Sequence, residues 1–190
     1  MIFSQLIHKI STYITLDKED IDLIRSSFEY KSVPKGVTLI EYGKVTNMAF
    51  FITSGYMKYT KTIDSGKELI VHLYTPNNFA TCLNSFFLGQ RAEETLQTIT
   101  DCEVLCITRS NLDKLYATNS KWQSFGRKLM EVALIEKEER VIDQLSLSAQ
   151  NRYLKLMENQ PDVIQNVPVK YIASFIGIEP ESLSRIRKTN

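Results

Sequence analysis

Residues 169–188 read VKYIASFIGIEPESLSRIRK, and this stretch predicts two short helices joined by a tight turn. Pro168 suits the start of the first helix, and Gly177 suits its end, because glycine readily adopts the left-handed backbone found there. Pro180 can open the second helix. The inward-facing positions are small or apolar: Ile172, Ala173, Ile176, Ile178, Leu183 and Ile186. This is the pattern of a helix-turn-helix, whose second helix enters the major groove of DNA.

The outer face of the second helix carries residue types that reach phosphates and base edges. They are Ser182, Ser184, Arg185 and Lys188. Residues 147–190 hold six basic and four acidic residues, whereas residues 1–146 hold 17 basic and 18 acidic ones. Both observations favour DNA binding. The alternative is a helical hairpin with a purely structural role.

Upstream of this motif, residues 121–145 contain no proline and a single glycine. Residues that are mostly apolar recur there at steps of three or four: Trp122, Phe125, Leu129, Val132, Ile135, Glu139, Ile142 and Leu145. The pattern predicts an amphipathic helix of roughly six to seven turns. Such a helix can pair with a copy of itself through a seam containing Phe125, Leu129, Val132 and Ile142, or it can pack on its own β-rich domain.

The preceding part of the chain is typical of β structure, since five of the seven glycines lie between residues 36 and 89. Strands are predicted over residues 37–42, 49–53, 56–63, 68–74, 95–100 and 102–108. In 68–74 the alternation places Leu69, Val71 and Leu73 on one face. Short strands at this spacing favour a sandwich or barrel. Helices are predicted over residues 3–10, 17–28 and 111–116.

Composition limits the classes of function. The chain has 190 residues, of which 43% are hydrophobic and 24% charged, with a net charge of +1. This excludes extensive disorder and a general electrostatic affinity for nucleic acid. No apolar run approaches the length of a membrane helix, and residues 1–10 lack the basic start of a signal peptide. We therefore expect a cytoplasmic protein that does not interact with membranes.

The sequence offers little for catalysis or metal binding. Cys82, Cys102 and Cys106 are too few to hold a four-thiolate iron–sulfur cluster in one chain. Cys102 and Cys106 would lie about 13 Å apart on one strand, so we expect small buried thiols and no disulfide between them. His8 and His72 fall in different elements. We expect neither an enzyme nor a protein with a cofactor or bound metal.

A β-rich domain, a long helix and a terminal helix-turn-helix together resemble the cyclic-AMP receptor and fumarate-nitrate regulator (Crp/Fnr) family. The resemblance covers nearly the whole chain and is carried by residues 34–89 and 172–188. It implies an α+β fold with three parts. Residues 1–116 would form a β-roll (a double-stranded β-helix or jelly roll) of the cyclic-nucleotide-binding type. Residues 117–146 would form a dimerisation helix, and 147–190 a winged-helix-type helix-turn-helix lacking most of the wing.

The resemblance also implies partners and site residues. The partners would be double-stranded DNA and a second copy of the chain. Glu181 and Arg185 fall where the family's recognition helix contacts DNA, and we expect Ser182 and Lys188 to contact the backbone. Pro180 stands where the family often has an arginine, so the target site should differ.

The family's phosphate-binding cassette resembles F-x-G-E-L followed by R-S/T-A. Here its glycine, glutamate and arginine are replaced by Thr81, Cys82 and Ala92. Arg91 is one residue away from the expected arginine, and Glu93 and Glu94 add negative charge. We therefore expect no response to cyclic AMP. The pocket region, left for another effector or for none, comprises Phe79, Thr81, Cys82, Leu83, Arg91 and Ala92.

The leading hypothesis is a dimeric DNA-binding transcription regulator. The alternative is an effector-binding or protein-interaction module with a vestigial helix-turn-helix.

Overall fold

The computed structural model describes residues 2–189. The helices are α1 (Phe3–Ser11), α2 (Lys18–Ser27), α3 (Leu83–Leu88), α4 (Arg109–Thr118), α5 (Ser120–Ser146), α6 (Ala149–Asn159), α7 (Pro161–Asn166), α8 (Val169–Ile176) and α9 (Pro180–Thr189). The strands are β1 (Glu29–Val33), β2 (Thr38–Ile40), β3 (Met48–Ser54), β4 (Met57–Thr62), β5 (Glu68–Tyr74), β6 (Phe79–Ala80), β7 (Glu94–Thr98) and β8 (Cys102–Thr108).

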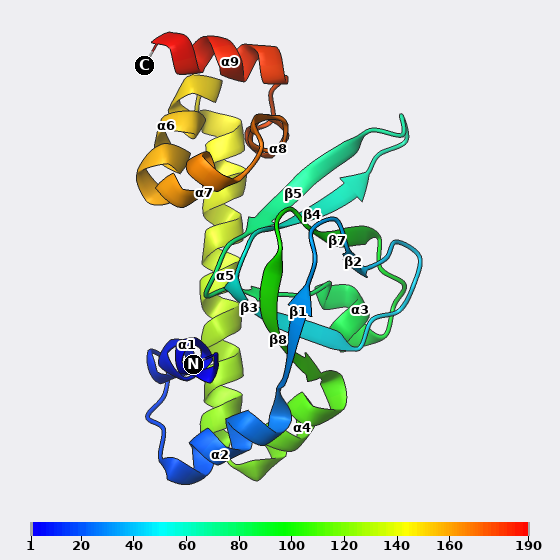
Figure 1. The fold of residues 1–190 in the computed structure, drawn as a ribbon, viewed down its shortest axis with the longest axis vertical. Coiled ribbons are helices and arrows are strands. Elements are labelled where there is room, and N and C mark those ends of the chain that lie inside the picture. Colours follow the sequence, from blue (N-terminus) through cyan, green and yellow to red (C-terminus); the bar gives the residue numbers. More distant parts are fainter. Residues whose placement is uncertain (1, 190) are drawn as a thin grey trace.

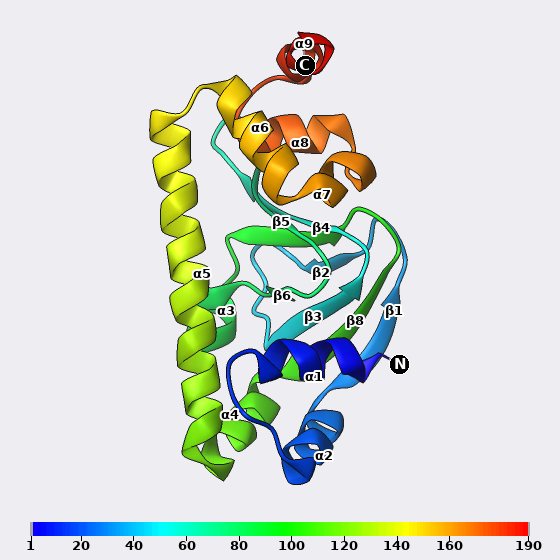
Figure 2. The same cartoon turned by 90° about the vertical axis from the view of Figure 1, so that its left-hand side faces the viewer.

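The strands form two four-stranded antiparallel sheets, in the orders β1-β8-β3-β6 and β2-β7-β4-β5. Apolar side chains from both sheets meet between them, among them Phe50, Ile52, Leu96 and Val104. Figures 1 and 2 show this β-roll beside one long helix, with α6 to α9 gathered at the upper end. The predicted α+β fold with a jelly-roll-like domain is confirmed.

The prediction for the face of β5 is wrong at two positions. Leu69 and Val71 are exposed, whereas Ile70 and Leu73 are buried. The pairing with β4 skips a residue, because Tyr59 faces His72 while the next residue, Thr60, faces Ile70. This bulge moves the buried face by one residue.

Several elements have no counterpart in the sequence-based prediction. These are β1, the short strand β6, the short helix α3, and the helices α6 and α7 that precede the helix-turn-helix. A tight turn joins β4 and β5, in which the Gly66 amide donates to the Ile63 carbonyl at 2.8 Å.

The long helix α5 has 27 residues and two different environments. Its first part packs on the β-roll: Trp122 and Phe125 are buried in the core, and Leu129 packs against it. From residue 131 to the end of α5 no residue is buried. Phe125 is therefore covered by the chain's own β domain, so its assignment to a pairing seam is wrong, whereas Leu129 is only partly covered.

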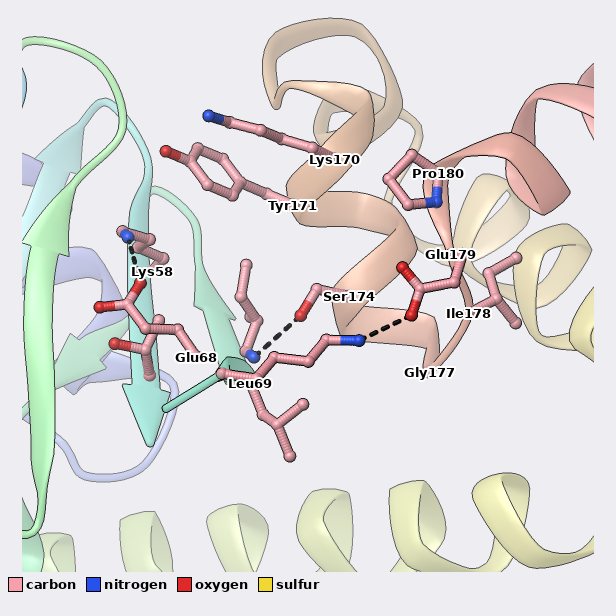
Figure 3. A pocket seen from close by; sticks show the side chains of 13 residues that line it. Lys58, Glu68, Leu69, Lys170, Tyr171, Ser174, Gly177, Ile178, Glu179 and Pro180 are labelled. Atoms are coloured by element: carbon pink, nitrogen blue, oxygen red, sulfur yellow. Dashed lines mark hydrogen bonds and ion pairs between the residues drawn. The ribbon is translucent and has the colours of Figure 1, made fainter. Parts of the chain in front are cut away.

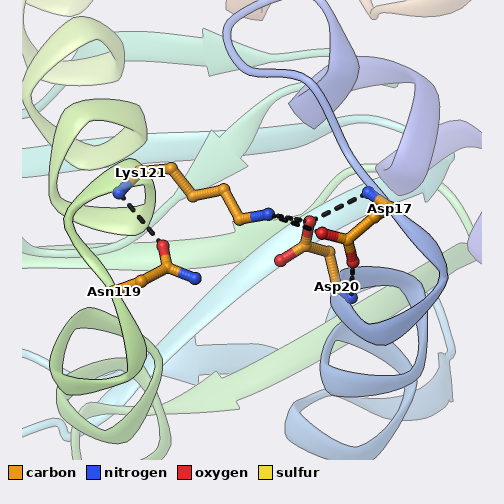
Figure 4. A network of polar contacts seen from close by, with 4 residues as sticks. All are labelled: Asp17, Asp20, Asn119 and Lys121. Carbon is orange, nitrogen blue, oxygen red and sulfur yellow. Dashed lines mark hydrogen bonds and ion pairs between the residues drawn. The ribbon is translucent and has the colours of Figure 1, made fainter.

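A buried carboxylate ties α2 to the start of α5 (Figure 4). Asp20 is 2% exposed, and it accepts from the Asp17 backbone amide at 2.9 Å. The Asp17 side chain in turn accepts from the Asp20 amide at 2.9 Å, which completes a capping box. Lys121 donates to Asp17 at 3.0 Å and also to Asp20. Asn119 caps α5 by accepting from the Lys121 amide at 3.0 Å.

Replacing Asp20 with alanine should destabilise the fold by about 2 kcal/mol, because it removes half of the capping box and the buried partner of Lys121. Urea denaturation followed by the fluorescence of Trp122, the single tryptophan, measures this. The control is Glu19→Ala, an exposed acid in the same turn, which should change stability by less than about 0.5 kcal/mol. Equal effects of the two substitutions would contradict a structural role for the network.

Candidate functional site

The helix-turn-helix is formed by α8 and α9. Gly177 ends α8 with a φ of 76°, and the Ile178 amide donates to the Ala173 carbonyl at 3.0 Å to close the turn. The residues predicted to face inward are placed as expected. Ile172, Ala173, Ile176 and Leu183 are buried in one cluster, with Ile178 and Ile186 packed against it.

The predicted DNA-contacting residues all lie on α9. Glu181, Ser184, Arg185 and Lys188 are exposed, and Ser182 is half-buried. Glu181, Arg185 and Lys188 follow at i, i+4 and i+7, so they share one face of the helix. Arg185 donates to the Ser182 hydroxyl at 3.2 Å, and the Ser184 hydroxyl donates to the Pro180 carbonyl at 3.0 Å.

The helix-turn-helix is docked on the hairpin of β4 and β5. Ile70 and Leu73 of β5 belong to the same buried cluster as the inner face of α8. The Ile70 amide donates to the Ser174 hydroxyl at 3.1 Å, and Lys67 pairs with Glu179 at 2.6 Å. Figure 3 shows these contacts around a cavity of about 460 Å³ between hairpin and helices.

Arg140 of α5 joins the same interface. Its guanidinium lies 4.0 Å from the ring centroid of Phe175, and it donates to the carbonyls of Ile70 and Phe175 at 3.3 and 3.1 Å. One side chain therefore connects the long helix, the hairpin and α8. The predicted apolar repeat of residues 121–145 does not include Arg140, because it passes through the neighbouring Glu139. The spacing Leu129, Ala133, Arg140 would have placed it on the face toward the β-roll.

A second cavity, of about 770 Å³, lies between the β-roll and α5 and reaches Phe175 of α8. Four of the six residues predicted for an effector pocket line it: Phe79, Thr81, Cys82 and Leu83. The other two predictions are wrong. Arg91 is exposed and donates to the Gly43 carbonyl at 2.8 Å, and Ala92 is buried in the β-roll core. Thus Arg91 does not place its positive charge in this cavity.

The β-roll does place a carboxylate in this cavity, that of Glu94. Its carboxylate accepts from the Tyr59 hydroxyl at 3.1 Å and from the Cys82 thiol at 3.5 Å. Burial and the neighbouring Cys82 raise the pKa of Tyr59 far above its ordinary value, and burial raises that of Tyr74 to about 12. Both tyrosines therefore keep their protons at neutral pH. Glu93, the residue beside Glu94, pairs with Lys61 at 2.8 Å.

His72 lies in the same cavity and stays neutral. Burial, together with the charges of Arg140 and Lys137, lowers its pKa to about 4. Its ring lies 4.4 Å from that of Tyr74 and 6.4 Å from that of Phe175. The imidazole therefore forms part of the aromatic wall between the β-roll and α8.

The lowered pKa of His72 predicts a dependence of stability on pH. The unfolded chain takes up a proton near pH 6.5, but the folded chain does so only near pH 4, so stability falls as the pH drops through this range. Between pH 7 and pH 5 the loss should be about 2 kcal/mol in urea denaturation. His72→Gln should remove this part of the slope, and His8→Gln, at an exposed position, should keep it. Parallel profiles for wild type and His72→Gln would contradict the assignment.

The cysteines are placed as predicted. Cys82, Cys102 and Cys106 are buried free thiols. Burial raises the pKa of Cys102, and raises that of Cys106 to about 11, which leaves both thiols protonated and weakly reactive. Within residues 2–189 no group of three or more His, Cys, Asp or Glu side chains is arranged to hold a metal ion. In the same range no helix has both the length and the hydropathy to cross a membrane.

Comparisons with known proteins agree with this geometry. Residues 30–119 match the model of the cyclic nucleotide-binding domain family, and no curated protein matches the sequence. Among solved structures, the global regulator CLP from Xanthomonas campestris is 18% identical, with a TM-score of 0.69 over 91% of each chain. FixK2 from Bradyrhizobium japonicum is 14% identical, with a TM-score of 0.74 over 85% of this chain and 83% of its own.

A third similar structure is described as a Crp/Fnr-family regulator from Eubacterium rectale. It is 15% identical, with a TM-score of 0.69 over 94% of this chain and 87% of its own. The β-roll of residues 30–119 is therefore a cyclic nucleotide-binding domain in fold. The chain shares the overall architecture of these solved structures, so the fold expected from the sequence resemblance is confirmed.

Proposed function

We propose that the protein is a homodimeric, cytoplasmic transcription regulator that binds double-stranded DNA through α9 and does not respond to cyclic AMP. The observation that carries this proposal is the outer face of α9. It presents Glu181, Arg185 and Lys188 on one side, while Leu183 anchors the helix in a fully packed helical domain. Glutamate, arginine and lysine on such a face are residue types that contact phosphates and base edges.

The exposed part of α5 supports the homodimer. Between residues 130 and 145 it leaves seven large apolar side chains exposed: Met130, Val132, Leu134, Ile135, Val141, Ile142 and Leu145. So many apolar groups on one solvent-facing helix are typical of a surface covered by a partner. A second copy of α5 fits this surface, because a symmetric pair of helices buries the same stripe on both chains.

The chemistry of the 770 Å³ cavity supports the proposal that the protein does not respond to cyclic AMP. A cyclic phosphate needs a cation close to the β-roll wall. At that wall the chain places the carboxylate of Glu94, and Arg91 is engaged elsewhere. An effector other than cyclic AMP has a parallel in CLP, which is described as responsive to c-di-GMP.

The docked hairpin provides a physical route from this cavity to DNA. The cavity is lined by residues of β5, α5 and α8 together, including His72, Arg140 and Phe175. A ligand that moves any one of these elements changes contacts that hold α8, and with it α9.

Selection from random duplexes at low salt tests the function. We expect the purified protein to enrich a palindrome with half-sites about one helical turn apart. Its affinity should fall steeply as salt rises, because phosphate contacts release counterions. Failure to enrich any sequence, at low salt and with candidate effectors present, would favour the module with a vestigial helix-turn-helix.

A further inference from the structure

The carboxylate of Glu94 is an acceptor with spare capacity. Both of its contacts, from Tyr59 and Cys82, are made to the oxygen Oε2. Among the residues that the structure describes, none donates a hydrogen bond to Oε1. A half-buried carboxylate that opens into a cavity can therefore take a further donor from a ligand.

Glu94 forms no direct ion pair within residues 2–189, although the charge of the nearby Lys61 acts on it. Lys61, on the adjacent strand, is paired with Glu93 at 2.8 Å. The donors that do reach Glu94 are a neutral hydroxyl and a neutral thiol, so its charge is not compensated by an ion pair. An ammonium group would supply the missing charge, because a charge-assisted hydrogen bond is stronger than a neutral one.

The wall around this carboxylate suits an aromatic body. The rings of Tyr59 and Tyr74 are 6.2 Å apart in an edge-on arrangement, and the rings of His72 and Phe79 complete the lining. Neutral aromatic faces stabilise both a flat apolar ring and a nearby cation.

The remaining charged groups of the cavity all lie on helices, and none is on the strands that carry Glu94 and the two tyrosines. They are Lys9 of α1 and Glu136, Lys137 and Arg140 of α5. Arg140 is committed to Phe175 and two carbonyls, and Lys9 lies over the Tyr13 ring at 5.8 Å. Lys137, like Arg140, lies near enough to His72 to lower its pKa, so the positive charge of the cavity is concentrated at α5.

We infer that this cavity binds a small aromatic amine, with Glu94 as the anchor for its ammonium group and the tyrosine-lined wall as the contact for its ring. The inference deepens the proposed function, since such an amine would be the regulator's effector. Its ring would lie beside His72 and Phe175, and thus beside the helix that positions α9.

Isothermal titration with pairs of probes that share a ring and differ in charge tests the inference. The amines are tryptamine, tyramine and phenethylamine, and the acids are indole-3-acetate, 4-hydroxyphenylacetate and phenylacetate. At least one amine should bind at least tenfold more tightly than its acid partner. Glu94→Gln should weaken that amine about tenfold or more, because the isosteric amide removes the charge. Glu41→Gln is the control, an exposed carboxylate outside the cavity, and should leave the affinity unchanged.

Three results would overturn the inference: no binding by any amine, equal or tighter binding by the acids or cyclic AMP, or unchanged amine affinity in Glu94→Gln. Circular dichroism of each variant shows that it is folded. These titrations contain no DNA. A failure of the selection experiment therefore leaves their outcome intact, and the loss of amine binding leaves DNA binding intact.

Discussion

A variant carrying both Leu134→Asp and Val141→Asp is expected to sediment as a monomer, whereas the wild type sediments as a dimer. The side chains of Leu134 and Val141 are 68% and 59% exposed and lie seven residues apart on α5, and Val141 also lines the 770 Å³ cavity. In a paired helix these positions would be desolvated, so a carboxylate at each would be buried without a partner on both chains. The expected effect on DNA is a loss of at least about 100-fold in affinity, because a monomer engages one half-site.

The matched control is Val45→Asp with Leu88→Asp, at side chains that are 58% and 67% exposed on the β-roll. Exposure and substitution are the same, but these residues lie away from α5, so the control should remain a dimer. Because a second apolar stripe passes through Ile135 and Ile142, the pair Ile135→Asp and Ile142→Asp is measured as well. Dimers in both α5 variants would show that the copies do not meet along this helix.

The second large effect concerns Arg185. Replacing it with alanine is expected to weaken binding to the selected palindrome by about 1 to 3 kcal/mol per half-site and to relax the preference at one base pair. Its place on the exposed face of α9, one turn after Glu181, puts a guanidinium where a recognition helix meets base edges. Binding assays across single-base variants of the palindrome measure both quantities.

Two comparisons distinguish base contact from general charge. Lys188→Ala should weaken all duplexes alike and reduce the dependence on salt, as expected for a phosphate contact. Lys170→Ala, an exposed cation on α8, should change neither affinity nor preference. Should Arg185→Ala enrich the same palindrome to the same extent as wild type, the role assigned to Arg185 would be refuted.

The helix-turn-helix could be predicted because its geometry demands particular residues. Two helices that cross closely need a small side chain such as Ala173, and the turn between them needs a left-handed residue, here Gly177. For the first part of α5, the helix could be predicted from the sequence, but the surface that covers its apolar face could not. Its apolar pattern was plain, but periodicity alone does not distinguish a face covered by the β-roll from one covered by a partner.

Other features depend on contacts far apart in sequence. The bulge in β5 is set by pairing with β4, so a strict alternation misplaced Leu69 and Val71. In the effector region, Arg91 seemed one residue from a phosphate-binding position, yet the loop carries it outward to Gly43. The sequence shows two adjacent carboxylates, Glu93 and Glu94, which add negative charge to this region. Only the structure separates them, with Glu94 in the cavity and Glu93 paired outside it.

The contacts of Ser174 and Arg140 with the β4–β5 hairpin have a consequence for the DNA. A recognition helix on a loose tether could swivel to follow its half-site. Here these contacts attach α9, through α8, to the β-roll. In the proposed dimer the distance between the two recognition helices would therefore be fixed. One inserted base pair shifts a half-site by about 3.4 Å and turns it by about 34°. With a fixed distance between the recognition helices, the duplex itself must bend or twist to restore the fit. The stiffness of the uncontacted central base pairs then becomes part of what the protein recognises.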